Sequence, residues 1–251
     1  LAVSALVPAV VGVVRLIVGL VRVGLDDGHG LRDREVDLRR TAGDLVRARV
    51  LVEHRAGRLL VGLLLGVVTG LANTSRSRFL RGIAILYIEA IRGTPLIVQV
   101  MFLYFGLPLA LGMRIPPDVA GVIAIGVNSG AYIAEIVRGA IQSIDKGQME
   151  AARSIGMSSG LAMRTVVLPQ AVVRMIPPLG NEFIALIKNS ALVSLLTIHD
   201  LMHEGQKIIS VSYRSLEVYL AIAVVYFILT GVTSLMLRRM ELRLRAGGMV
   251  Q

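Results

Sequence analysis

The sequence predicts an all-α membrane protein: a polytopic helix bundle with about five core spans. Of its 251 residues, 55% are hydrophobic and only 18% are charged, and the mean hydropathy is +0.72. A soluble domain of this length carries more charge and fewer uninterrupted apolar runs. A spanning helix needs roughly 20 apolar residues to cross about 30 Å of hydrocarbon. Several apolar runs approach or meet that length, so the bilayer is expected to surround most of the chain.

The charged residues are unevenly placed along the chain. The formal net charge is +10, from 27 Lys and Arg against 17 Asp and Glu. The cations gather between apolar runs and at the C-terminus, which is typical of cytoplasmic loops. With 4% aromatic residues and no basic domain, we expect a lipid bilayer and no nucleic acid as partner. The absence of cysteine excludes disulfides, thiolate nucleophiles and zinc–thiolate sites.

Apolar runs and turn residues place the expected spans in order. Leu59–Asn73 is 15 residues long, about 22 Å as a helix, which is short for a span. A helical Ile83–Arg92 follows it, and Pro95 suits the first turn of the next helix. The remaining expected spans are Pro95–Leu111, Val119–Ile141, Ile176–Ile198 and Leu216–Leu237. Polar segments over 142–169 and 199–215 connect the later spans.

The two ends of the chain differ from the middle. We expect an atypical region over 1–58, with a possible extra span over 1–25 followed by a charged segment. A signal peptide is not expected there, because a positively charged start and a small-residue cleavage site are missing. A transmembrane domain is expected over 59–240 and a basic tail over 241–251. The arginines that follow the last span predict a cytoplasmic C-terminus, on the same side as 142–169 and 74–81.

The polar segment 142–169 carries a spaced pattern. Glu-Ala-Ala is followed after three residues by Gly, and nine residues later by Val-x-Leu-Pro. The positions are Glu150, Ala151, Ala152, Gly156, Val166, Leu168 and Pro169. The alanines favour a helix and allow close packing against a partner; Gly156 permits a turn out of that helix, and Pro169 marks the approach to the next span. A surface helix with an ordinary loop is the alternative, and the complete spacing argues against it.

This pattern resembles the cytoplasmic signature of the permease subunits of bacterial ATP-binding-cassette importers, with Val166 in the place of an isoleucine. The similarity covers about residues 59–240. Further segments resemble the branch that imports polar amino acids of the histidine, glutamine and arginine type. They are Tyr87–Leu96, Phe102–Pro108, Asn128–Tyr132, Gly180–Phe183 and Ile187–Ser190. The resemblance implies a type I importer-like permease in a bacterial cell membrane, which moves polar amino acids by alternating access.

The resemblance also implies partners. They are an ATP-binding-cassette ATPase subunit, an extracellular or periplasmic amino acid-binding protein, and a second permease subunit in a homo- or heterodimer. Coupling to the ATPase is expected at Glu150, Ala151, Ala152, Gly156, Leu168 and Pro169. The sequence contains no Gly-rich phosphate loop ending in Gly-Lys-Ser or Gly-Lys-Thr. We therefore expect a pore subunit that is not an enzyme and binds no cofactor, with ATP and Mg²⁺ on the partner.

Polar residues inside the expected spans are candidates for the substrate path, because an unpaired polar group in hydrocarbon is costly. Gln99 and Asn128 lie near the middle of their spans, and Tyr132 is one turn from Asn128. Amides that join helices are the alternative explanation. Glu135 with Arg138, and Glu89 with Arg92, are spaced for same-face pairs, and we expect these pairs to be structural.

Two other classes of protein fit the sequence less well. An ion-coupled secondary transporter would place its site at broken helices in an inverted repeat, and no repeat is evident here. A membrane enzyme would need a nucleophile–base or metal constellation. His199 and His203 are four residues apart, but a third ligand is not evident, so no metal site is expected.

Overall fold

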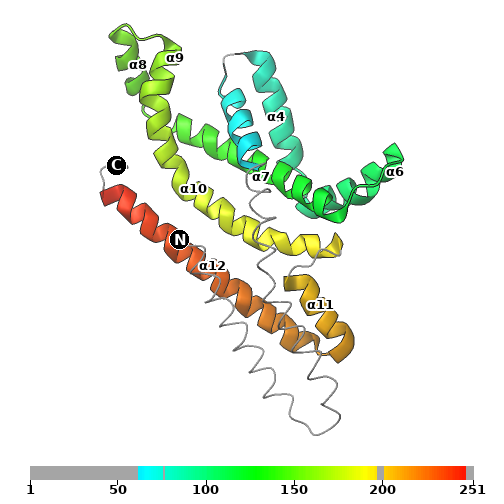
Figure 1. Ribbon diagram of the computed structural model, residues 1–251. Coiled ribbons are helices and arrows are strands. Elements are labelled where there is room, and N and C mark those ends of the chain that lie inside the picture. Colours follow the sequence, from blue (N-terminus) through cyan, green and yellow to red (C-terminus); the bar gives the residue numbers. More distant parts are fainter. Residues whose placement is uncertain (1–61, 76, 197–200, 247–251) are drawn as a thin grey trace. The chain divides into compact units, whose positions relative to one another are not determined.

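The computed structural model describes residues 62–75, 77–196 and 201–246. The described residues form helices and no strand, so the predicted all-α fold class is confirmed. Figure 1 draws the described helices in the order of the sequence. The chain divides into two compact units. Of the described residues, the larger unit contains those within 62–187 and 233–246, and the smaller unit contains 188–196 and 201–232.

Three described helical segments are long and apolar enough to cross a membrane. They are α7 (Pro117–Gln142), the continuous segment Ser159–Leu196, and the Ser215–Leu242 part of α12 (Ser215–Ala246). A bent pair, Arg78–Arg92 with Leu96–Leu111, gives a fourth. The shorter apolar helix Gly62–Asn73 precedes them. The described residues thus contain three or four spans. The short Gly62–Asn73 helix would be the fifth of the about five core spans expected.

The Gly62–Asn73 helix packs on α7 through three glycines spaced four residues apart. Gly62, Gly66 and Gly70 are all buried. An added Cβ at Gly66 would lie 2.9 Å from the carbonyl oxygen of Gly130, and closer still to the Cβ of Ile133. Glycines at this spacing let two helix backbones approach each other closely. The short first helix is therefore held against α7 by near backbone-to-backbone contact.

The hydrophobic core of the larger unit lies between the second half of α7 and the first half of α10 (Leu168–Asn189). Ile133, Val137 and Ile144 pack there with Ala171 and Met175. The small residues of α7 are almost all buried, whereas many large apolar side chains of α4 and α12 are exposed. This is the pattern of a bundle whose outer surface faces lipid.

The bent pair contains a sharp break at Gly93–Pro95. α4 (Arg78–Arg92) ends there, and the chain turns by 100° into α5 (Leu96–Met101). Pro95 directly precedes α5, so the expected helix start at this proline is confirmed within one residue. Gly93 closes α4 by donating its N–H to the carbonyl oxygen of Glu89 at 2.8 Å.

Two π-helical turns precede prolines in the described spans. The turn Phe102–Gly106 comes before Pro108, and the turn Met163–Val167 comes before Pro169. In each case the residue before the proline donates its N–H to a carbonyl oxygen five residues back. A proline lacks an N–H and its ring crowds the preceding turn, and a wider turn relieves that crowding.

The segment 142–169 is largely helical. It contains α8 (Lys146–Ser154), α9 (Ser159–Ala162) and the π turn η2 (Met163–Val167), which runs directly into α10. The span expected to begin at Ile176 therefore begins earlier. Pro169 stands inside this continuous helix, so its expected role as the boundary before the span is wrong. The π turn is the reason, because it lets the helix continue past a residue without an N–H.

The smaller unit contains η3 (Ser190–Leu196), α11 (Leu201–Ser212) and the first part of α12. The polar connection expected over 199–215 is thus mostly a helix. Gly205 is buried against Ile222 and Val218 of α12, where an added Cβ would lie 3.4 Å from Val218. This packing of a small residue against an apolar helix explains why the segment is helical despite its polar composition.

The expected domain boundaries stay predictions. The atypical region 1–58, including the possible span 1–25, lies outside the described residues. In the tail expected over 241–251, α12 continues as far as Ala246. The boundary expected near residue 240 is therefore not marked by the end of a helix.

Candidate functional site

The α8–α9 hairpin is built by three local devices. Asp145 caps the start of α8, since its Oδ1 accepts the N–H of Gly147 at 2.6 Å. At the other end Gly156 has φ +89°, a conformation that favours glycine. Its N–H donates to the carbonyl oxygen of Arg153 at 3.1 Å, and Met157 donates to Ala152 at 3.2 Å. This pair of bonds is the Schellman motif. The expectation that Gly156 turns the chain out of the helix is confirmed.

The residues of the spaced pattern divide between two faces of the hairpin. Ala152 is buried, and its neighbour Met149 packs against the core of the larger unit. Glu150 and Ala151 are exposed, and the backbone carbonyl of Glu150 accepts a hydrogen bond from the Ser154 hydroxyl at 3.0 Å. Ile155 next to Gly156 is 76% exposed. α8 therefore packs on one face and leaves Glu150 and Ala151 exposed on the other. Figure 1 shows α8 lying beside α9.

Leu168 and Pro169 lie at the beginning of α10. Leu168 is half-buried and packs against the same core as Met149. Leu168 thus helps to pack the base of the hairpin onto the core, whereas Pro169 is exposed. The pattern thus contributes two exposed positions on α8 and a buried base beneath them.

Gln99 and Asn128 meet directly. The side-chain nitrogen of Asn128 donates to the amide oxygen of Gln99 at 3.0 Å. The side-chain nitrogen of Gln99 in turn lies 2.7 Å from the carbonyl oxygen of Ile91 and 2.8 Å from the hydroxyl of Thr94. These bonds join α7 and α5 to the break after α4. The amides hold the bend, and the sequence-based alternative of amides that join helices agrees with this geometry.

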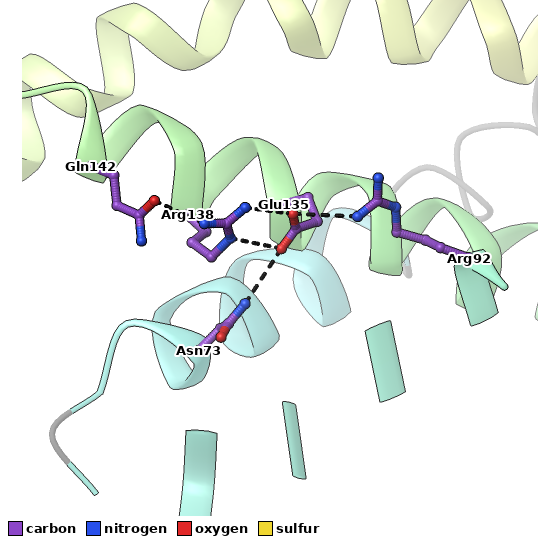
Figure 2. A network of polar contacts seen from close by, with 5 residues as sticks. All are labelled: Asn73, Arg92, Glu135, Arg138 and Gln142. Carbon is purple, nitrogen blue, oxygen red and sulfur yellow. Dashed lines mark hydrogen bonds and ion pairs between the residues drawn. The ribbon is translucent and has the colours of Figure 1, made fainter. Parts of the chain in front are cut away.

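A second polar cluster surrounds Glu135 of α7 (Figure 2). Arg138 donates from Nε and Nη2 to the two carboxylate oxygens at 2.8 and 2.7 Å, so the expected Glu135–Arg138 pair is confirmed. The side-chain nitrogen of Asn73 donates to Oε1 at 3.4 Å. Arg92 of α4 reaches Oε2 at 3.3 Å. One carboxylate therefore joins the end of the first described helix, the end of α4 and α7.

The expected pair of Glu89 with Arg92 is wrong. Among the described residues Arg92 forms its ion pair with Glu135 instead. Its guanidinium carbon also lies 5.4 Å from the centre of the Tyr132 ring, in a cation–π contact. The reason is the break after Arg92, which brings the last residue of α4 against α7. Sequence spacing along one helix contains no information about a carboxylate on another.

Tyr132 is 39% exposed, whereas Asn128 is 6% exposed. The two residues lie one turn apart on α7, but only Tyr132 offers a substantial surface.

Three features were not predicted from the sequence: the Glu135 cluster, the contact of Arg92 with Tyr132, and the glycines of the first described helix. Of these, only the glycines could have been recognised from the sequence, because they are spaced four residues apart. Within the described part of the chain, no group of three His, Asp or Glu residues could hold a metal ion, and His199 lies outside it.

Comparison with known proteins identifies the class to which this fold and hairpin belong. A family model described as the inner membrane component of binding-protein-dependent transport systems matches residues 62–246. The chain belongs to this family.

Individual relatives agree with that assignment. The glutamine transport system permease protein GlnP of Escherichia coli K12 is 47% identical over 185 residues, which cover 73% of this chain and 84% of that protein. The arginine transport system permease protein ArtQ of Bacillus subtilis 168 is 37% identical over 187 residues, covering 74% and 85%. A crystal structure of an amino acid ABC transporter with histidines superposes with a TM-score of 0.73 at 44% identity, covering 76% of this chain and 89% of that one. Membership of this multi-pass membrane family favours a permease over the ion-coupled alternative.

Proposed function

We propose that the chain is a pore-forming permease subunit of an ATP-driven importer of polar amino acids. The observation that carries the proposal is the complete Glu-Ala-Ala spacing on a hairpin between two spans, with Glu150 and Ala151 exposed. The names of the glutamine and arginine permeases among its relatives support the substrate class. An ion-coupled transporter has no use for a docking surface of this kind.

The partner at α8 is a separate ATPase subunit that binds ATP and Mg²⁺. Ala151 allows close approach, Glu150 supplies a charge for a partner cation, and the exposed Ile155 adds apolar contact. A substrate-binding protein on the outer face and a second permease subunit, identical or different, complete the assembly. This chain itself carries out no hydrolysis.

The orientation follows from the basic loops. Residues 74–81 and 142–169 and the arginine-rich end of α12, Arg238–Arg245, lie in the cytoplasm, because basic segments that flank spans resist translocation. ATP binding drives alternating access only if the nucleotide favours one arrangement of the two α8 helices over the other. α8 transmits that difference to α7 and α10 through its buried face.

Gln99, Asn128 and Tyr132 are proposed to line the substrate path. Tyr132 supplies exposed surface, and the two amides stand at the break in the preceding span. A substrate that bound the amides would have to replace the Asn128–Gln99 hydrogen bond. Tyr132 is therefore the member of this group that is best placed to contact it.

The docking claim is tested by reversing the charge of α8. Glu150→Lys is expected to reduce co-purification of the ATPase subunit about tenfold or more, equal to about 1.4 kcal/mol. Asp118→Lys is the control, because Asp118 is an exposed acid at the start of α7, far along the chain from α8. Because the Glu150 side chain is exposed, thermal stability should be unchanged. Equal co-purification of wild type and Glu150→Lys would contradict the docking claim.

A further inference from the structure

Arg92 is a charged residue inside the bent span, and its donors are mostly unused. A guanidinium carries five N–H donors. Among the described residues its single polar contact is the 3.3 Å approach of Nη1 to Glu135. Its side chain is 38% exposed. An arginine in a span costs about 2.5–3.5 kcal/mol on insertion scales, so one that keeps free donors marks a functional path.

Arg138 provides the contrast within the same cluster. All three of its guanidinium nitrogens are engaged, two with Glu135 and the third with Gln142 at 2.8 Å. Both oxygens of Glu135 already accept bonds from Arg138. The carboxylate is therefore satisfied without Arg92, and the cluster holds one more positive charge than negative. Figure 2 shows a single contact from Arg92 to Glu135 and the rest of its guanidinium turned away from the carboxylate.

Tyr132 fixes the position of this guanidinium. The cation–π contact at 5.4 Å keeps the charged group over a ring that is itself 39% exposed. A planar guanidinium with free parallel N–H groups is the side chain best suited to bind a carboxylate in a bidentate manner. The site also lies beside the break of a bent span, where irregular backbone is tolerated only if it is buried in protein or lines a cavity.

We propose that Arg92, positioned by Tyr132 and Glu135, binds the α-carboxylate of the amino acid during its passage. The inference rests on the proposed function and adds the chemical group that the path recognises. Every α-amino acid carries this carboxylate, so the site selects amino acids as a class without distinguishing their side chains. Glu135 takes no part in binding; it holds Arg92 and keeps the local charge close to balance.

The test measures direct binding to the purified complex of this chain with its ATPase, without the substrate-binding protein. The probes are L-glutamine and L-arginine, each compared with its own α-carboxamide, which lacks the carboxylate. In the wild-type complex, we expect the amino acid that is taken up in an ATP-dependent manner to bind more tightly than its amide. The expected difference is about ten- to a hundredfold, as for a charge-assisted hydrogen bond. Equal affinity for the two, or no saturable binding of either, would overturn the assignment.

Variants separate binding from structure. Arg92→Gln should abolish the preference for the acid over the amide, and Arg92→Lys should keep part of it because the charge remains. Arg114→Gln is the matched control, because Arg114 is exposed and its substitution removes the same charge at another place in the chain. A folded Arg92→Gln complex that keeps the full preference would also refute the proposal. If that variant does not assemble, the wild-type comparison still decides. Failure of ATP-dependent uptake in the wild type would instead refute the proposed function itself.

Discussion

The glycines of the first described helix give a sharp test of how the larger unit is packed. An added Cβ at Gly66 would approach the Gly130 carbonyl oxygen to 2.9 Å and the Cβ of Ile133 more closely. Real Cβ atoms hardly ever come within 3.0 Å of such atoms, so Gly66→Ala must push the helix away from α7. Overpacking of this kind costs about 1–3 kcal/mol. Alanine also gains about 1 kcal/mol of helix propensity over glycine, and this partly hides the cost.

Gly82 is a control that separates the gain in helix propensity from the cost of the clash. An added Cβ at Gly82 of α4 meets no atom within 4 Å, so Gly82→Ala carries the helix gain without the clash. The difference in unfolding free energy between the two variants is thus expected to be about 1–3 kcal/mol. The assay is denaturant unfolding of the purified chain in detergent micelles.

A second variant tests the geometry of the clash. Ile133→Ala keeps its Cβ and leaves the Gly130 carbonyl in place, so Gly66→Ala combined with Ile133→Ala should not recover the lost stability. Equal stability of Gly66→Ala and Gly82→Ala would refute the close approach of the first helix to α7. Recovery in the double variant would show that the clash lies with the end of the Ile133 side chain.

Three further predictions follow from the polar contacts and the loops. Glu135→Gln should destabilise the chain by about 1.5–3 kcal/mol, because charged hydrogen bonds from two arginines are weakened. Glu89→Gln, at an exposed carboxylate, should change little, and equal losses would contradict the cluster. Gln99→Leu should lower thermal stability and uptake together if the amide holds the bend, whereas loss of uptake at unchanged stability would assign it to the substrate path alone. Single cysteines at Lys146 and Met240, in a chain that has none of its own, should react with impermeant thiol reagents only after the membrane is opened, and labelling in intact cells would reverse the orientation.

The fold class could be predicted from the sequence, because apolar runs and basic loops are local features of the chain. It also located the hairpin, because Glu150, Ala152 and Gly156 form a pattern that is short along the chain. Gly156 was predicted correctly for a physical reason, since a positive φ at a helix end requires a residue without a Cβ. Local rules of this kind need no knowledge of the tertiary structure.

Helix boundaries and ion pairs were less predictable. The turn before Pro169 could not be foreseen, because a π turn depends on how the helix is anchored at both of its ends. Arg92 was assigned to Glu89, three residues away, although its partner Glu135 lies on another helix. The same limit applies to Gln99 and Asn128, which were recognised as polar residues within spans but not as direct partners. Contacts between helices depend on the 100° bend at Gly93–Pro95. Pro95 marked the position of this break in the sequence, but not its angle.

The central claim is that ATP hydrolysed by a separate subunit drives amino acid import through this chain. The most direct test reconstitutes the chain with its ATPase and substrate-binding protein in vesicles, and collapses the proton and sodium gradients with ionophores. Uptake of L-glutamine or L-arginine should persist, should depend on ATP on the side of α8, and should be lost in the Glu150→Lys variant. Uptake that requires an ion gradient and continues without ATP would contradict the account.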